Sequence, residues 1–309
     1  MAFDRLIEKI IETKNPTVVG LDPKLAYIPE EIIKDCFKKY GENAEGAAQA
    51  FLAFNKGIID AICDIVPAVK PQCAYYEALG WQGMRALAET IEYAQSKGMF
   101  VIEDGKRNDI GSTMEMYAIA HIGENQVGEN TFKPFGADAL TVNGYLGTDG
   151  VAPLLPICEK SDKGMFILVK TSNKSSGELQ DRVLDNGDTI YNAMGKMCEE
   201  WGKESRGKYG YSAVGAVVGA TYPKQLSEMR ELMPHTFILV PGYGAQGGTA
   251  EDVKGAFDER GLGAIINSSR GILTAWQKKG MEGKDYAKGA REAALEMKAD
   301  ITSKIPEIK

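Results

Sequence analysis

Short hydrophobic segments, rich in β-branched residues, recur along the whole chain and end in polar residues or glycine. Between them lie stretches whose apolar residues repeat every three or four positions. Strands of a parallel sheet are covered on both faces, so they form continuous apolar runs instead of alternating ones. The pattern therefore predicts eight buried parallel strands, within 17–22, 65–72, 99–107, 139–143, 165–171, 214–221, 236–244 and 263–270.

The intervening stretches predict helices. Their apolar faces consist of Phe3, Leu6, Ile7 and Ile10 in the first, Phe51, Phe54, Ile58 and Ile62 in the second, and Met84, Leu87, Ile91 and Ala94 in the third. Strands that alternate with helices form right-handed βαβ units. Eight such units predict an α/β protein with a single (β/α)₈ TIM barrel, one catalytic domain over residues 1–309, with longer excursions at 23–50 and 172–210. An open, doubly wound sheet is the alternative, although eight strands are many for that fold.

A barrel fold predicts where the chemistry lies, because barrel active sites are built at the C-terminal ends of the strands. The predicted strands end in residues that can bind or react. These are Asp22, Lys70, Asp104, Lys106, Thr171, Gly242 and Arg270.

Composition removes several classes of function. The net charge is −7 with 44% hydrophobic residues, which excludes a disordered chain and disfavours nucleic-acid binding. No apolar run is long enough for a membrane span, and charges interrupt the N-terminal segment, so we expect neither membrane insertion nor a signal peptide. Five cysteines without a CxxC pair and two histidines indicate neither disulfides nor a metal site. We therefore expect a cytoplasmic protein.

The strongest local signal is Asp104-Gly-Lys106-Arg-Asn-Asp109 at the end of the third strand. Alternation along a strand points Asp104 and Lys106 to one face. A lysine flanked by two carboxylates stays protonated and can act as a general acid. Lys70 ends the neighbouring strand, where it would extend the charged array. A solvated charged turn for 104–109, and a surface lysine at position 70, are the alternatives.

The last two strands indicate a phosphate site. The segment PGYGAQGG, residues 241–248, is glycine-rich, and glycines let backbone N–H groups approach an anion. Arg270 ends the eighth strand, and its guanidinium can hold a phosphate. A flexible loop is the alternative for 241–248. Asp22 fits either a sugar hydroxyl or a turn before Pro23, and Lys170 remains open as a Schiff-base lysine if it points inward.

At these residues the chain resembles the orotidine 5′-phosphate decarboxylase family, in its longer bacterial branch. The motifs occur in the same order over most of the chain, as VGLDP, VKPQCAYYE, EDGKRNDIGST, TVNGYLG, VKTSN, VPGYGAQGG and SSRGI. The departures are Gly105, Asn108 and Gly144, where alanine, glycine and proline are expected. None of them removes a charged group.

The resemblance implies a role for each charged residue. Lys106 would donate a proton to C6 of the pyrimidine, and Asp104 would face the substrate carboxylate. Lys70 would hold Asp104 and the ribose hydroxyls. Asp109, with Thr113 beside it, would complete the array from the other subunit of a homodimer, so that active sites are shared across the interface.

The resemblance also implies which residues bind the nucleotide. Asp22 would bind the ribose, and Ser172 would bind the pyrimidine amide. Gln246 would link that region to the phosphate, with Gly247 also in contact with substrate, and Arg270 would hold the phosphate itself.

The implied reaction is a carboxy-lyase step, orotidine 5′-phosphate to uridine 5′-phosphate, the last step of de novo UMP synthesis. It needs no metal or cofactor, because pre-positioned charges can stabilise a carbanion at C6. Two alternatives remain. One is a Mg²⁺-dependent sugar-phosphate decarboxylase or hexulose-phosphate synthase of the same superfamily, which Lys70 disfavours because it would repel a divalent cation. The other is a non-catalytic phosphate-binding barrel.

Overall fold

The computed structural model describes residues 1–244 and 246–309. In this part of the chain, eight parallel strands close into a barrel, in the order β1-β10-β9-β8-β7-β6-β3-β2. They are β1 Thr17–Leu21, β2 Ala68–Pro71, β3 Phe100–Arg107, β6 Ala139–Val142, β7 Gly164–Lys170, β8 Val214–Val218, β9 Ile238–Val240 and β10 Ala264–Ser268. Each matches one predicted segment, with only β7 beginning one residue earlier than predicted, at Gly164, and this confirms the barrel. Because β1 pairs with both β2 and β10, the open-sheet alternative is wrong.

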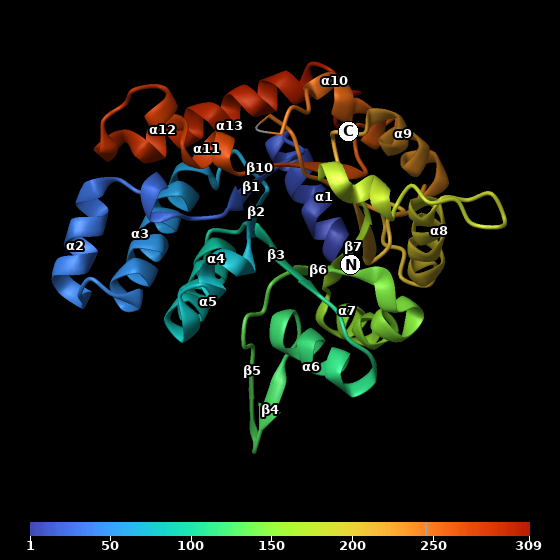
Figure 1. Cartoon of the computed structure of the whole chain (residues 1–309), viewed down its shortest axis with the longest axis horizontal. Helices are drawn as coiled ribbons and strands as arrows, with labels where there is room; N and C mark the ends of the chain where they lie inside the picture. The colour runs from blue at the N-terminus through green and yellow to red at the C-terminus, as the bar shows by residue number, and fades with distance from the viewer. Residues whose placement is uncertain (245) are drawn as a thin grey trace.

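Helices surround the barrel (Figure 1). The α-helices are α1 Ala2–Thr13, α2 Glu30–Tyr40, α3 Ala44–Ile62, α4 Cys73–Glu77, α5 Gly80–Ser96, α6 Gly111–His121, α7 Leu155–Ser161, α8 Ile190–Gly202, α9 Pro223–Leu232, α10 Ala250–Val253, α11 Arg270–Leu273, α12 Ala275–Lys278 and α13 Tyr286–Thr302. The 3₁₀ helices are η1 Leu25–Tyr27, η2 Gly144–Gly150, η3 Ala152–Leu154, η4 Lys174–Glu178, η5 Lys254–Ala256 and η6 Gly283–Asp285. None of the described helices has the length and apolar character needed to cross a lipid bilayer.

The amphipathic N-terminal segment forms α1, whose predicted apolar face is fully buried. The Phe3 ring packs among aromatic rings at the N-terminal ends of the strands, with its centroid 4.9 Å from that of Phe166 and 5.4 Å from that of Phe237. A Cβ at residue 164 would come within 2.9 Å of the Phe3 ring, so glycine opens β7 where this ring needs space. Helix α1 therefore closes the end of the barrel opposite to the predicted site.

Two parts of the chain were not anticipated as structure. Residues Asn125–Val127 and Asn130–Phe132 form an antiparallel hairpin, β4–β5, which projects away from the barrel in Figure 1. The predicted excursion at 172–210 contains η4, a loop and α8, and its loop projects beyond α8 in Figure 1. The hairpin has no apolar period long enough to give a signal, whereas α8 has Tyr191, Met194 and Cys198 at helical spacing, a signal that the interpretation of 172–210 as an excursion did not use.

Candidate active site

A buried aspartate between two lysines is the centre of the site. Asp104, near the end of β3, accepts hydrogen bonds from Lys70 Nζ at Oδ2 and from Lys106 Nζ at Oδ1, each at 2.6 Å. Lys70 is the next-to-last residue of β2, which is paired with β3, so strand pairing brings these side chains together. Asp104 and Lys70 are almost fully buried, whereas the Lys106 side chain is 45% exposed.

The charges of this cluster hold one another in the ionised state. Burial alone would raise the pKa of Asp104, but the ammonium groups of Lys70 and Lys106 lower it well below its usual range. Burial would likewise lower the pKa of Lys70, yet the carboxylates of Asp104 and Asp22 raise it above its usual value. Both directions favour the charged pair, so the site carries fixed charges at neutral pH.

The backbone at Lys106 is unusual and explains how its side chain reaches Asp104. Lys106 has a φ of 48°, which is uncommon for a residue with a Cβ. Pairing of β3 with β6 is irregular between Glu103 and Arg107. Thr141 of β6 supports this turn, because its Oγ1 accepts from Lys106 N at 2.9 Å and donates to Asp104 Oδ1 at 2.9 Å. Sequence reasoning missed Thr141, although a polar residue in an otherwise apolar strand was the available signal.

The cluster lies in a cavity of about 730 Å³ at the C-terminal ends of the strands. Leu168, Val217 and Leu239, which point into the barrel, form its apolar floor. This cavity is lined by the strand-end residues that the sequence predicted, together with two of the expected ligand-binding residues. They are Asp22, Lys70, Asp104, Lys106, Thr171, Ser172, Gly242, Gln246 and Arg270.

A turn made by glycines forms one side of the cavity. Gly242 and Gly247 have φ values of 100° and 99°, in the region that favours glycine. The turn is closed by hydrogen bonds from Gly244 N to Gly248 O and from Gly248 N to Gly242 O, at 2.8 and 3.1 Å. Arg270 opens α11 on the neighbouring strand end and lines the same cavity. A backbone turn and a guanidinium thus face one volume, as an anion site requires.

Two buried oxygens in the cavity wall are available to a ligand. Among the residues that the structure describes, Asp22 Oδ1 and Asn267 Oδ1 have no hydrogen-bond partner. A buried acceptor without a partner is costly, so a ligand that brings hydroxyl or amide donors would be stabilised there. Asp22 was expected from the sequence, whereas Asn267 was missed, although it stands in the apolar run that forms β10.

The comparisons with known proteins agree with this geometry. A family model described as "Orotidine 5′-phosphate decarboxylase / HUMPS family" matches residues 25–284. This chain belongs to that family. It is 47% identical to an orotidine 5′-phosphate decarboxylase of Rhodopirellula baltica over 86% of each chain, and 42% identical to one of Clostridium perfringens over 99% of each. A solved structure of Leishmania donovani OMP decarboxylase superposes with a TM-score of 0.73, at 28% identity, over 98% of this chain and 97% of that one.

Three of the residues implied by the family resemblance do not line the cavity of their own chain. Asp109 follows β3 and accepts a hydrogen bond from Ile110 N at its Oδ1, at 2.7 Å. Thr113 is exposed on α6. Gly247 lies in the glycine turn, next to Gln246, without lining the cavity. Among the described residues of one chain, the Lys106 ammonium therefore pairs with Asp104 and with no second carboxylate.

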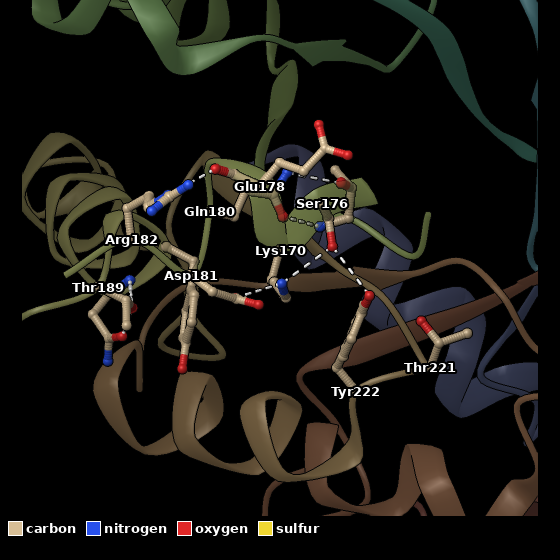
Figure 2. A network of polar contacts seen from close by, with 12 residues as sticks. Lys170, Ser176, Glu178, Gln180, Asp181, Arg182, Thr189, Thr221 and Tyr222 are labelled. Carbon is tan, nitrogen blue, oxygen red and sulfur yellow. Dashed lines mark hydrogen bonds and ion pairs between the residues drawn. The ribbon is translucent and has the colours of Figure 1, made fainter. Parts of the chain in front are cut away.

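Lys170 does not face the cavity, so the Schiff-base interpretation is wrong. Pairing of β7 with β8 shifts between Leu168 and Lys170, where β7 gains an extra residue. This bulge breaks the alternation that would have pointed Lys170 inward with Leu168. The Lys170 side chain is fully buried outside the cavity, and its Nζ binds Asp181 and Ser176 (Figure 2).

The rest of the cavity wall comes from segments to which the sequence pattern assigned no role. Lys24 stands at the cavity with its Nζ 5.8 Å from the centroid of the Tyr27 ring and 5.7 Å from that of Tyr75. Asn173 and Gln180 belong to the excursion after β7. The loop position of these residues, which follow β1 and β7, was the signal that could have identified them.

Proposed function

We propose that this protein decarboxylates orotidine 5′-phosphate to uridine 5′-phosphate without a metal or cofactor. One observation carries the proposal: a buried aspartate lies between two lysines, 2.6 Å from each, in the cavity at the C-terminal ends of the barrel strands. Relatives that carry this activity in their names match nearly the whole chain. The cavity volume suits a nucleotide, since small-molecule sites usually enclose about 300–1,000 Å³.

In the proposed reaction, the bond between C6 and the carboxylate breaks and its electron pair stays on C6. The Lys106 ammonium then gives its proton to C6, and solvent restores that proton because the side chain is 45% exposed. A fixed cation at the position where negative charge develops needs no reorganisation during the reaction. Asp104, near the departing carboxylate, would repel it and relax as CO₂ leaves.

The remaining cavity residues account for the rest of the nucleotide. Asp22 would accept from the ribose hydroxyls with its unpartnered oxygen. Ser172 would bind the pyrimidine amide. Gln246 and Gly247, with Arg270, would hold the phosphate. Phosphate binding is remote from C6, so its free energy can be used to order the glycine turn and complete the charged site.

The Mg²⁺-dependent alternative is less well supported by the residues. Each carboxylate oxygen of Asp104 is bound by an ammonium group, and these two positive charges would repel a divalent cation. Among residues 1–244 and 246–309, no group of three His, Cys, Asp or Glu side chains is placed to hold a metal. The family description joins two groups, orotidine 5′-phosphate decarboxylases and HUMPS. The relatives named above carry the name of the first group.

The proposal includes a homodimer with shared active sites. Asp109 and Thr113 lie outside the cavity of their own chain, Asp109 on the segment that leads into α6 and Thr113 in the first turn of α6. Large apolar side chains near them are exposed, and such patches mark interaction surfaces. They are Ile110, Met116, Tyr145 and Leu146. A second copy that covered this surface would bury these side chains and could bring its Asp109 to Lys106.

The experiment is to add orotidine 5′-phosphate to the purified protein and follow the loss of its ultraviolet absorbance, with and without EDTA. We expect turnover that EDTA leaves unchanged. Loss of activity in EDTA with recovery in Mg²⁺ would favour the metal-dependent alternative. Binding without turnover would favour a non-catalytic barrel.

We also propose a cytoplasmic location. All five cysteines are free, which is consistent with a reducing compartment.

A further inference from the structure

A fully buried lysine stands behind one wall of the cavity. Lys170 is 0% exposed and ends β7, with its carbonyl accepting from Gly219 N at 2.8 Å. Its Nζ donates to Asp181 Oδ1 at 2.6 Å and to Ser176 Oγ at 3.1 Å. The Tyr222 ring centroid lies 4.3 Å away. A buried ammonium needs such partners because it has lost its hydration.

Two of these partners, Ser176 and Asp181, belong to the segment that returns to the cavity. The chain leaves β7 through Thr171, Ser172 and Asn173, passes through η4 with Ser176, and comes back at Gln180 and Asp181. Figure 2 shows Lys170 between Ser176 and Asp181, with Gln180 above it. One side chain fixed to the barrel thus holds both the middle and the end of this segment. We call residues 171–181 the β7 wall.

Contacts within the β7 wall, and from Thr221 and Tyr222 after β8, connect this support to the cavity. Gln180 Oε1 accepts from Thr171 N at 3.0 Å, and its Nε2 donates to Thr171 Oγ1 at 2.8 Å. Ser172 O accepts from Thr221 Oγ1 at 3.2 Å, and Tyr222 OH donates to Asn173 O at 3.3 Å. Thr171, Ser172, Asn173 and Gln180 all line the cavity.

We propose that Lys170 is a positioning residue that fixes the β7 wall, and with it Ser172, against the pyrimidine of the substrate. The catalytic consequence rests on the proposed decarboxylase function. Lys170 itself does not touch the substrate, and it acts through Asp181, Ser176 and the Tyr222 ring. Asp181 is 45% exposed, so it tolerates loss of the lysine, whereas Lys170 has no access to solvent.

The test compares Lys170→Met with Lys163→Met. Lys163 directly precedes the same strand at its other end, is also buried, and has an aspartate, Asp138, 3.5 Å away. The Lys170 variant should lower kcat/KM for orotidine 5′-phosphate by about 10- to 100-fold, because small misplacements of binding groups have effects of this size. The control variant should stay within about 2-fold of wild type.

A double-mutant cycle separates positioning from general destabilisation. In a Ser172→Ala background, adding Lys170→Met should change kcat/KM by no more than about 3-fold, because the group being positioned is already absent. Hydrogen exchange gives a readout that does not depend on activity. Amides of 171–181 should exchange faster in Lys170→Met and in Asp181→Asn, but not in Lys163→Met.

The outcomes are distinct. Unchanged amide hydrogen exchange in the β7 wall of Lys170→Met would overturn the proposal. So would additive effects of Lys170→Met and Ser172→Ala on kcat/KM, or an equal loss of kcat/KM in Lys170→Met and Lys163→Met. If wild type does not turn over orotidine 5′-phosphate, the proposed function fails, and the exchange comparison alone then decides the role of Lys170. If Lys170→Met does not fold, Asp181→Asn decides it by the same kinetic and exchange criteria.

Discussion

Replacing Lys70 with methionine removes one of the two cations that hold Asp104, while the methionine fills a similar volume. Asp104 keeps the Lys106 ammonium and the Thr141 hydroxyl as partners. The lost contact is short, at 2.6 Å, and both side chains are at least 90% buried. The variant is therefore left with a buried carboxylate that is only partly compensated.

The size of the loss follows from this burial. Two unit charges 2.6 Å apart attract by about 6 kcal/mol at an effective dielectric constant of about 20. Desolvation offsets part of this, and removing one partner of a buried pair costs about 3–5 kcal/mol. Because Lys106 still compensates Asp104, we expect the lower end, a loss of about 3 kcal/mol in the free energy of unfolding at pH 7.

The loss should depend on pH with a definite sign. The pKa of Asp104 is lowered in the folded state. The ionised carboxylate therefore stabilises the fold fully above pH 3.8, the unfolded pKa, and this stabilisation is lost as the pH falls through the folded pKa. Lys70→Met raises that folded pKa, so the difference between wild type and variant should be largest above about pH 5 and shrink in acid. The pKa of Lys70 is raised in the folded state. Its contribution to stability is therefore fully present below pH 10.5, the unfolded pKa, and is lost as the pH rises through the folded pKa.

Urea unfolding at pH 7, 5, 4 and 3 measures this difference. Lys97→Met is the matched control, because Lys97 and Asp60 form a pair of similar length, 2.7 Å, whose side chains are 37% and 48% exposed. Solvent screens such a pair, so the control should unfold almost as wild type does. An equal loss in both variants, or a Lys70→Met loss that stays constant from pH 7 to pH 3, would refute the electrostatic reasoning.

Three further predictions concern the proposed reaction. Lys106→Ala should lower turnover by orders of magnitude while the fold survives, since alanine places the same Cβ at the φ of 48°; near-normal turnover would show that the proton donor is another group. Arg270→Ala should weaken capture of orotidine 5′-phosphate far more than that of phosphate-free orotidine, with partial rescue by guanidinium ion; equal losses on both would remove Arg270 from the phosphate site. Mixing inactive Lys106→Ala and Asp109→Ala dimers, with subunit exchange verified, should restore about a quarter of wild-type activity if sites are shared, and none if Asp109 acts within its own chain.

The sequence alone predicted eight parallel strands, because continuous apolar runs are a local signal that each strand carries for itself, whereas pairing of β1 with both β2 and β10 decided that the sheet closes. The face of α1 was equally local, with Phe3, Leu6, Ile7 and Ile10 at helical spacing. The strand-end residues followed from the fold, since the C-terminal ends of parallel strands share one edge. Lys70 and Asp104 could thus be expected near each other, on neighbouring strands, before any distance was known.

Tertiary structure decided which side chains meet. The extra residue at Lys170 turned that side chain away from the cavity, and no periodicity in the sequence marks such a bulge. Thr141 became a partner of Asp104 only because β6 pairs with an irregular part of β3. Gln180 reached the cavity through a segment held by Lys170. Each of these contacts joins residues whose relative positions are set by strand register and loop packing, which depend on the closed barrel and not on the local pattern of apolar and polar residues.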